Sequence, residues 1–127
     1  MAKYKGRSGI SINHLIETYF EALRTEEGEL RNQAYQEIIV ASNEPVAWAY
    51  DVWDEMKSNL SHEDNHMRSI AAQILSNLAK SDPEKRMLKN FPELIAVTQD
   101  KRFVTARHCL QSLWKIGLAG NEQRQML

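Results

Sequence analysis

Apolar residues recur at helical spacing through the segment 64–80, which reads DNHMRSIAAQILSNLAK. Residues three or four positions apart lie on the same side of an α-helix, so this spacing predicts an amphipathic helix with one buried face. The predicted apolar face consists of Met67, Ile70, Ala71, Ile74, Leu75 and Leu78.

The segment 30–42, LRNQAYQEIIVAS, repeats this pattern 37 residues earlier in the chain. The two segments agree in register as well as in composition, because polar and apolar residues fall at the same relative positions. Leu30, Arg31, Ala34, Gln36, Ile38 and Ala41 correspond to Met67, Arg68, Ala71, Gln73, Leu75 and Leu78. A fixed offset of this length predicts that a two-helix unit is repeated along the chain.

Four further segments have amphipathic helical spacing, and none shows the strict alternation that predicts a β-strand. They cover residues 11–25, 45–60, 83–98 and 103–117. Ser11 is a candidate cap for the first of them. Pro92 is expected to kink or break its helix near Asn90, because proline removes an internal backbone hydrogen bond. Together with the two segments above, these predict six helices in three antiparallel pairs.

A chain of 127 residues has the size of one compact domain, and we expect one helical domain over residues 11–127 after a loose leader at 1–10. Predicted helix starts divide this domain into repeated units. The units cover about residues 11–42, 43–80 and 81–120, with a tail at 121–127. The tail resembles the first turn of another helix pair. Either Met126 and Leu127 cap the stack, or the chain belongs to a longer array.

The composition is that of a soluble globular protein, with 26% charged and 43% hydrophobic residues. No apolar run approaches the roughly 18 residues that a membrane-spanning helix needs, so no membrane partner is expected. Cys109 is the single cysteine and lies in an apolar helical pattern. This excludes a disulfide framework and favours a buried, unreactive thiol. We therefore expect a cytoplasmic protein.

The net charge of −1 conceals an uneven distribution of charge along the chain. Residues 8–64 sum to −9, whereas residues 65–127 sum to +5 and the first seven residues add +3. A molecule polarised in this way can steer charged partners or associate head to tail. Self-association through the ends of the stack is one interpretation, and ordinary solvation of helix surfaces is the other.

The repeated segments resemble HEAT repeats, which are helical arrays with a period of about 40 residues. The resemblance covers residues 11–120 and rests on LRNQAYQEI, MRSIAAQILSNLA and FPELIAVTQDKRFVTARHCLQSL. In the family pattern an acidic residue in the turn, here Asp64, precedes a hydrophobic residue and an arginine, here Met67 and Arg68. The third unit departs from the pattern, because Val104–Thr105 lacks the arginine.

The resemblance implies a right-handed α–α superhelix of about three helical hairpins, with the second helix of each hairpin lining a concave surface. It also implies a non-catalytic protein-interaction or scaffold module that binds a partner there and needs no cofactor. A minority of the family, the DNA-alkylation-repair-like glycosylases, bind duplex DNA on the same surface. Nucleic-acid binding is therefore the alternative function, since a fold does not fix a function.

Polar residues off the apolar stripes of the second helices are the candidate contacts with a protein partner. Amide-rich surfaces with few carboxylates suit recognition of a peptide backbone or a helix, although ordinary solvation is the simpler interpretation of any one residue. The candidates are Gln36, Gln73, Asn77, Lys80, Arg107, Gln111 and Lys115.

The nucleic-acid alternative would use basic residues of the second half, whose phosphate contacts weaken with salt. These are Arg68, Lys80, Lys101, Arg102, Arg107, Lys115 and Arg124. The acidic first half and the isoelectric point of about 6.4 argue against it, because a long duplex would be repelled.

His62, Glu63 and His66 form a formal HExxH, the signature of zinc hydrolases. That chemistry needs both histidines on one helical face and a glutamate beside a metal-bound water. The motif is disfavoured because it spans a predicted turn, and only Glu84 is a conceivable third ligand. We therefore expect no metal site, no catalytic residue and no enzyme activity.

Overall fold

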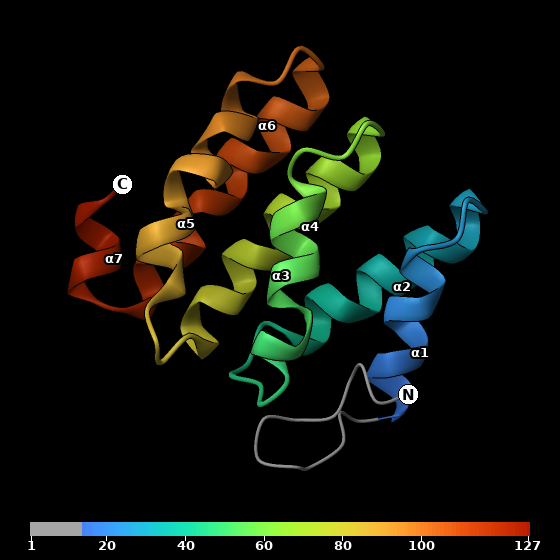
Figure 1. The fold of residues 1–127 in the computed structure, drawn as a ribbon, viewed down its shortest axis with the longest axis horizontal. Helices are drawn as coiled ribbons and strands as arrows, with labels where there is room; N and C mark the ends of the chain where they lie inside the picture. The colour runs from blue at the N-terminus through green and yellow to red at the C-terminus, as the bar shows by residue number, and fades with distance from the viewer. Residues whose placement is uncertain (1–13) are drawn as a thin grey trace.

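The computed structural model describes residues 14–127, and this part of the chain consists of α-helices, 3-10 helices and the turns between them, without a β-strand (Figure 1). The all-α class expected from the sequence is confirmed. The proposed cap at Ser11 and the leader at 1–10 lie outside the described residues. The α-helices are α1 (His14–Leu23), α2 (Gly28–Ala41), α3 (Ala49–Asn59), α4 (Asn65–Leu78), α5 (Arg86–Ile95), α6 (Phe103–Ser112) and α7 (Asn121–Gln125).

The first six helices form three antiparallel pairs that lie side by side (Figure 1). The pairs are α1 with α2, α3 with α4, and α5 with α6. The second helices make one layer, because α4 packs against α2 on one side and α6 on the other, and α3 packs against α5 in the other layer. The right-handed sense of the stack remains a prediction. No helix in the described range is long and apolar enough to cross a membrane.

Helix α4 is the centre of the hydrophobic core. All six residues of its predicted apolar face are buried. Ala72, Ser76 and Asn77 are buried as well, although they lie outside that face. The reason is that α4 contacts α2, α3 and α6, so neighbours cover most of its circumference. The periodicity therefore located the buried face correctly and underestimated its width.

Several element boundaries differ from the sequence expectation. Helix α3 begins at Ala49 rather than near Pro45, and the backbone N–H of Val46 donates to Ser81 Oγ at 2.8 Å instead of entering a helix. Helix α5 begins at Arg86. The carboxylate of Asp82 accepts hydrogen bonds from the backbone N–H groups of Arg86 and Met87, both at 2.8 Å. A buried carboxylate thus satisfies two donors at the start of α5.

Pro92 was expected to kink or break its helix near Asn90. The break does not occur, since α5 continues through Pro92 to Ile95. Asn90 instead accepts a hydrogen bond from the indole N–H of Trp53 at 2.9 Å, which joins α5 to α3. Leu94, two residues after the proline, is fully buried, so tertiary contacts anchor α5 on both sides of Pro92.

In the part of the chain that the structure describes, 3-10 helices follow α4, α5 and α6: η2 (Ala79–Ser81), η3 (Ala96–Gln99) and η4 (Leu113–Ala119). The tail forms α7, which packs against η4 and α5. Gln123 is buried and Met126 packs on the core, whereas Leu127 is half-exposed. The expected turn of helix in the tail is therefore present, and Met126 rather than Leu127 attaches it to the core.

Candidate functional site

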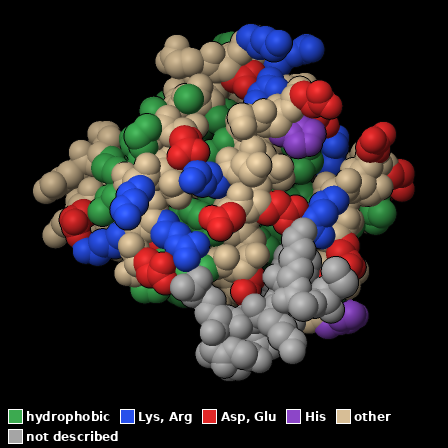
Figure 2. Space-filling view, viewed as in Figure 1, with side chains coloured by type: hydrophobic (Ala, Val, Ile, Leu, Met, Phe, Trp, Pro, Cys, Tyr) green, Lys and Arg blue, Asp and Glu red, His purple; other side chains and the backbone are tan. Residues whose placement is uncertain are grey.

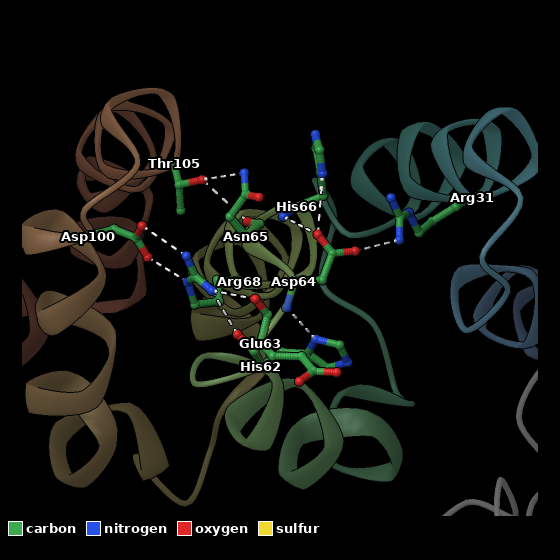
Figure 3. A network of polar contacts seen from close by, with 9 residues as sticks. All are labelled: Arg31, His62, Glu63, Asp64, Asn65, His66, Arg68, Asp100 and Thr105. Atoms are coloured by element: carbon green, nitrogen blue, oxygen red, sulfur yellow. Dashed lines mark hydrogen bonds and ion pairs between the residues drawn. The ribbon is translucent and has the colours of Figure 1, made fainter.

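Arginine–aspartate pairs join the second helix of one unit to the turn before the second helix of the next unit (Figure 3). Arg31 of α2 donates from Nη1 to Asp64 Oδ2 at 3.0 Å. Arg68 of α4 donates from Nε and Nη2 to the two carboxylate oxygens of Asp100, at 2.6 and 3.0 Å. The same contact therefore recurs one unit further along the stack, which fixes the spacing of α2, α4 and α6.

Each aspartate of these pairs also orders the start of the helix that follows it. Asp64 Oδ1 accepts from the backbone N–H of His66 at 2.9 Å, and Asp100 Oδ1 accepts from that of Arg102 at 2.8 Å. Arg68 in addition donates from Nη1 to the carbonyl oxygens of His62 and Glu63, at 2.8 and 3.1 Å. One ion pair thus closes a turn as well as joining two units.

The ionisation of both aspartates reflects these contacts. Burial by itself would raise the pKa of Asp64, but the His66 N–H and the Arg31 guanidinium outweigh it, so this pKa is lowered. The pKa of Asp100 is lowered chiefly by the hydrogen bond from Arg68, against an opposing effect of burial. Hydrogen bonds and positive charge favour the carboxylate form, which keeps both pairs charged near neutral pH.

The third unit has no arginine at this position, as the sequence showed. Thr105 of α6 is buried there and faces α4, donating from Oγ1 to the carbonyl oxygen of Asn65 at 3.3 Å. The Asn65 side-chain amide donates back to Thr105 Oγ1 at 3.4 Å. Within the described residues, the repeated ion pairs therefore end at Asp100, and a neutral hydrogen-bonded contact replaces them on α6.

An open groove of about 590 Å³ lies along the N-terminal halves of the second helices. Residues of α2 form one wall, residues of α4 the floor, and residues at the start of α6 the other wall. The lining consists of Asn32, Tyr35, Asn65, His66, Ser69, Ile70, Gln73, Arg102, Phe103, Val104, Thr105 and His108. Arg102 is the one arginine among them, and no lysine or carboxylate lines the groove.

Gln73 links the two walls across the floor of the groove. The hydroxyl of Tyr35 donates to Gln73 Oε1. The amide nitrogen of Gln73 donates to Ser69 Oγ at 3.0 Å and lies 3.4 Å from Nδ1 of His108. Burial raises the pKa of Tyr35, with the Gln73 contact opposing, so the phenol remains a donor at neutral pH. These contacts fix the shape of the floor before any ligand is present.

The predicted partner-binding residues do not gather in one place. Gln73 lies in the groove, whereas Gln36, Arg107 and Gln111 are exposed outside its lining. The prediction for Asn77 is wrong: it is fully buried and donates from Nδ2 to Ile39 O, Ser42 Oγ and Asn43 Oδ1, at 3.1, 3.0 and 3.3 Å. It faces α2 because the layer of second helices is packed on both sides of α4.

Lys80 and Lys115 lie near each other at the opposite end of the second helices. Lys80 Nζ donates to the carbonyl oxygens of Ser42 and Asn43, at 3.4 and 3.1 Å, at the C-terminal end of α2. Burial lowers the pKa of Lys80, Lys115 lowers it further, and Glu44 acts in the opposite direction. Lys80 therefore has a structural role, because its ammonium group binds backbone carbonyl oxygens at the C-terminal end of a helix. Lys115 is half-buried.

The HExxH residues occupy a turn and the first turn of α4, as the sequence indicated. Helix α4 begins at Asn65, so His62 lies outside it and accepts a hydrogen bond at Nδ1 from the Asp64 backbone N–H, at 2.9 Å. Glu84 is paired with Arg86 before α5, at 3.1 Å. No group of three or more potential metal ligands occurs within residues 14–127.

Cys109 is fully buried on α6. Its thiol donates a hydrogen bond to the carbonyl oxygen of Leu94, 3.5 Å away. Burial raises the pKa of this thiol to about 11. The expected buried cysteine is confirmed. A thiol with this pKa is almost entirely protonated at neutral pH, which makes it a poor nucleophile.

The sequence pattern did not single out most of the groove residues. Tyr35, His66, Ser69 and His108 were absent from the predicted surface, which extended toward the C-terminal ends of the helices instead. The available signal was the spacing from Gln73, because Ser69 and His66 lie four and seven positions before it and share its helical face. No family model, curated protein or solved structure matches the chain. The candidate site is therefore defined by the geometry of the groove and of the ion pairs beside it.

Proposed function

We propose that the chain is a HEAT-like helical-repeat protein that acts without catalysis, by binding a segment of a protein partner in the groove of α2, α4 and α6. The groove itself is the observation that supports this function: it is open, about 590 Å³ in volume, and formed by the second helices. Amide, hydroxyl and imidazole groups lie along it beside apolar surface from Ile70 and Phe103.

This lining suits a peptide better than a small charged ligand. Amide and hydroxyl groups both donate to and accept from a peptide backbone, and no carboxylate or lysine lines the groove. The floor is preorganised by the Tyr35–Gln73–Ser69 hydrogen bonds, so little ordering of the protein opposes binding. An uncharged segment with one or two apolar side chains is therefore the expected ligand. A reducing compartment such as the cytoplasm suits the buried free thiol of Cys109.

A displayed library of random peptides, selected on the full chain, tests this function. Asn32→Trp fills the groove from an exposed position of α2, and Gln36→Trp places the same side chain one turn away, outside the lining. We expect the selected peptides to bind the wild type and Gln36→Trp equally well. Their affinity for Asn32→Trp should be at least about tenfold lower, which corresponds to roughly 1.4 kcal/mol. Peptides insensitive to Asn32→Trp, or no selected sequence, would refute the groove as the binding site.

Nucleic-acid binding is the weaker proposal, because two of the seven bases considered for it are already engaged. Arg68 is held by Asp100 and Lys80 by the end of α2. Of the other five, Lys115 is half-buried, and the exposed bases remain as candidates: Lys101, Arg102, Arg107 and Arg124. A gel shift with random duplex at about 50 mM salt separates the two functions, since phosphate contacts are strongest at low salt. A shift that weakens steeply with salt would favour this alternative.

A further inference from the structure

The outer side of α6 carries a row of exposed apolar side chains. Phe103, Arg107, Leu110 and Trp114 are spaced at i, i+4, i+7 and i+11 from α6 into η4, and we name these four residues the α6 face. Phe103, Leu110 and Trp114 are between 60% and 73% exposed. The guanidinium of Arg107 lies over the ring of Phe103, 5.4 Å from its centroid. Val104 and Leu118 are exposed next to it, and Phe103 and Val104 also line the edge of the groove at the start of α6.

The α6 face is the side on which the stack would continue. The opposite side of α6 is buried against the rest of the stack through Thr105, Cys109 and Ser112. Helix α4, which has a second helix on both sides, buries nine of its residues, whereas α6 buries these three. Helix α7 packs against η4, which continues α6, and against α5. Exposed apolar rows of this kind mark interaction sites.

The other end of the stack presents a second face with exposed apolar residues. Leu30, Gln33, Glu37 and Val40 are spaced at i, i+3, i+7 and i+10 on α2, and we name them the α2 face. Leu30 is 43% exposed and Val40 65%. Helix α2 buries only Ala34 and Ile38. The two ends thus have faces built in the same way, one on the first and one on the last of the second helices.

The charges around the two faces are opposite. Glu26, Glu29 and Glu37 are exposed on or beside α2, while Arg24 and Arg31 are paired with Glu55 and Asp64. Figure 2 shows acidic side chains at the edge of the molecule where the turn between α1 and α2 lies.

At the α6 end the bases Lys101, Arg102 and Arg107 are exposed, as is Arg124 of α7. The acids Asp100 and Glu122 are paired with Arg68 and Lys85. Internal pairing therefore leaves negative charge at one end of the stack and positive charge at the other.

We propose that the α6 face binds the α2 face of a second copy of this chain. The contact continues the layer of second helices from α6 of one copy to α2 of the next, in the way that α4 contacts both neighbours within one copy. It is heterologous, because the two faces differ, and it leaves one face of each kind open at the ends of the assembly. Contact between two α6 faces would bring like charges together, so a symmetric dimer is disfavoured.

Two single substitutions in the full chain test the proposal, each at an exposed residue of one face. Trp114→Glu blocks the α6 face and Val40→Lys blocks the α2 face. Sedimentation velocity over a range of protein concentration should show the wild type associating, and less so at high salt, since charge contacts are screened. Each variant alone should remain monomeric, because every copy lacks the same half of the contact.

An equimolar mixture of the two variants is the decisive measurement. The intact α6 face of Val40→Lys can bind the intact α2 face of Trp114→Glu, so the mixture should give 1:1 dimers that grow no further. Ser58→Glu and Ser58→Lys make the same charge changes at an exposed position of the central helix α3 and should associate as the wild type does. A monomeric wild type, variants that associate normally, or a mixture that stays monomeric would each overturn the proposal.

Discussion

The guanidinium of Arg68 binds both carboxylate oxygens of Asp100, which lies 32 residues further along the chain. The side chains of this pair are 12% and 7% exposed, respectively, and Arg68 also holds two carbonyl oxygens of the turn before its own helix. Removing either partner leaves the charge of the other largely desolvated. The pair also joins α4 to the turn before α6, so its loss would loosen the packing of these two helices. This pair is therefore expected to be among the most costly polar contacts to break.

Arg68→Ala should lower the free energy of unfolding by about 3 kcal/mol, because it leaves the Asp100 carboxylate buried without its partner. Arg24→Ala is the matched comparison. It removes a pair of similar geometry with Glu55, but those side chains are 30% and 23% exposed. Its cost should be about 1 kcal/mol or less. Urea unfolding of the three proteins measures both values, and equal costs would show that burial of the Arg68 pair contributes nothing.

Stability should fall in acid because the pKa values of Asp64 and Asp100 are lowered in the folded state. A carboxyl with a depressed folded pKa contributes stability that is complete above its unfolded pKa, about 3.9, and is lost as pH falls through the folded value. The midpoint of urea unfolding should therefore decrease below about pH 4. Asp100→Asn, already weaker at neutral pH, should lose less over the same range. A loss as large as that of the wild type would contradict the assignment.

Asn77→Ala should destabilise the fold even though the sequence pattern placed this residue on the surface. Its amide nitrogen donates to three acceptors of α2 and the following turn. Loss of these bonds leaves the Ser42 hydroxyl and the Ile39 carbonyl without that donor, at a cost of about 1–3 kcal/mol. Gln36→Ala changes an exposed residue and should stay within about 0.5 kcal/mol of the wild type. Thermal unfolding of both variants would show equal stability if Asn77 were solvated.

The Cys109 thiol should react slowly in the native protein. Its pKa is about 11, against about 8.5 for an ordinary thiol, so at pH 8 its thiolate fraction is lower by roughly two orders of magnitude. Burial restricts access further. Labelling with a thiol-specific disulfide reagent should be at least about a hundredfold slower in native protein than in urea. Comparable rates in both states would mean that α6 opens readily.

The helices and the buried face of α4 followed from the sequence because backbone geometry sets the spacing of apolar residues on a helix. The recurrence of Arg31 at Arg68 likewise indicated a repeated unit. The structure adds what Arg31 and Arg68 bind: an aspartate of the following unit in each case. The predicted helix ends were less accurate. Val46 makes a tertiary hydrogen bond and Asp82 a capping one, and the local spacing of apolar residues encodes neither.

The sequence by itself determined the all-α class, the repeat length and the residues that α4 turns toward the core. The tertiary structure alone decided which polar residues remain accessible: Asn77 is enclosed between packed helices, whereas Tyr35, Gln73 and His108 meet along one groove. The physical reason is that helical periodicity fixes the direction in which a side chain leaves its own helix. Its exposure depends on neighbours that come from other parts of the chain.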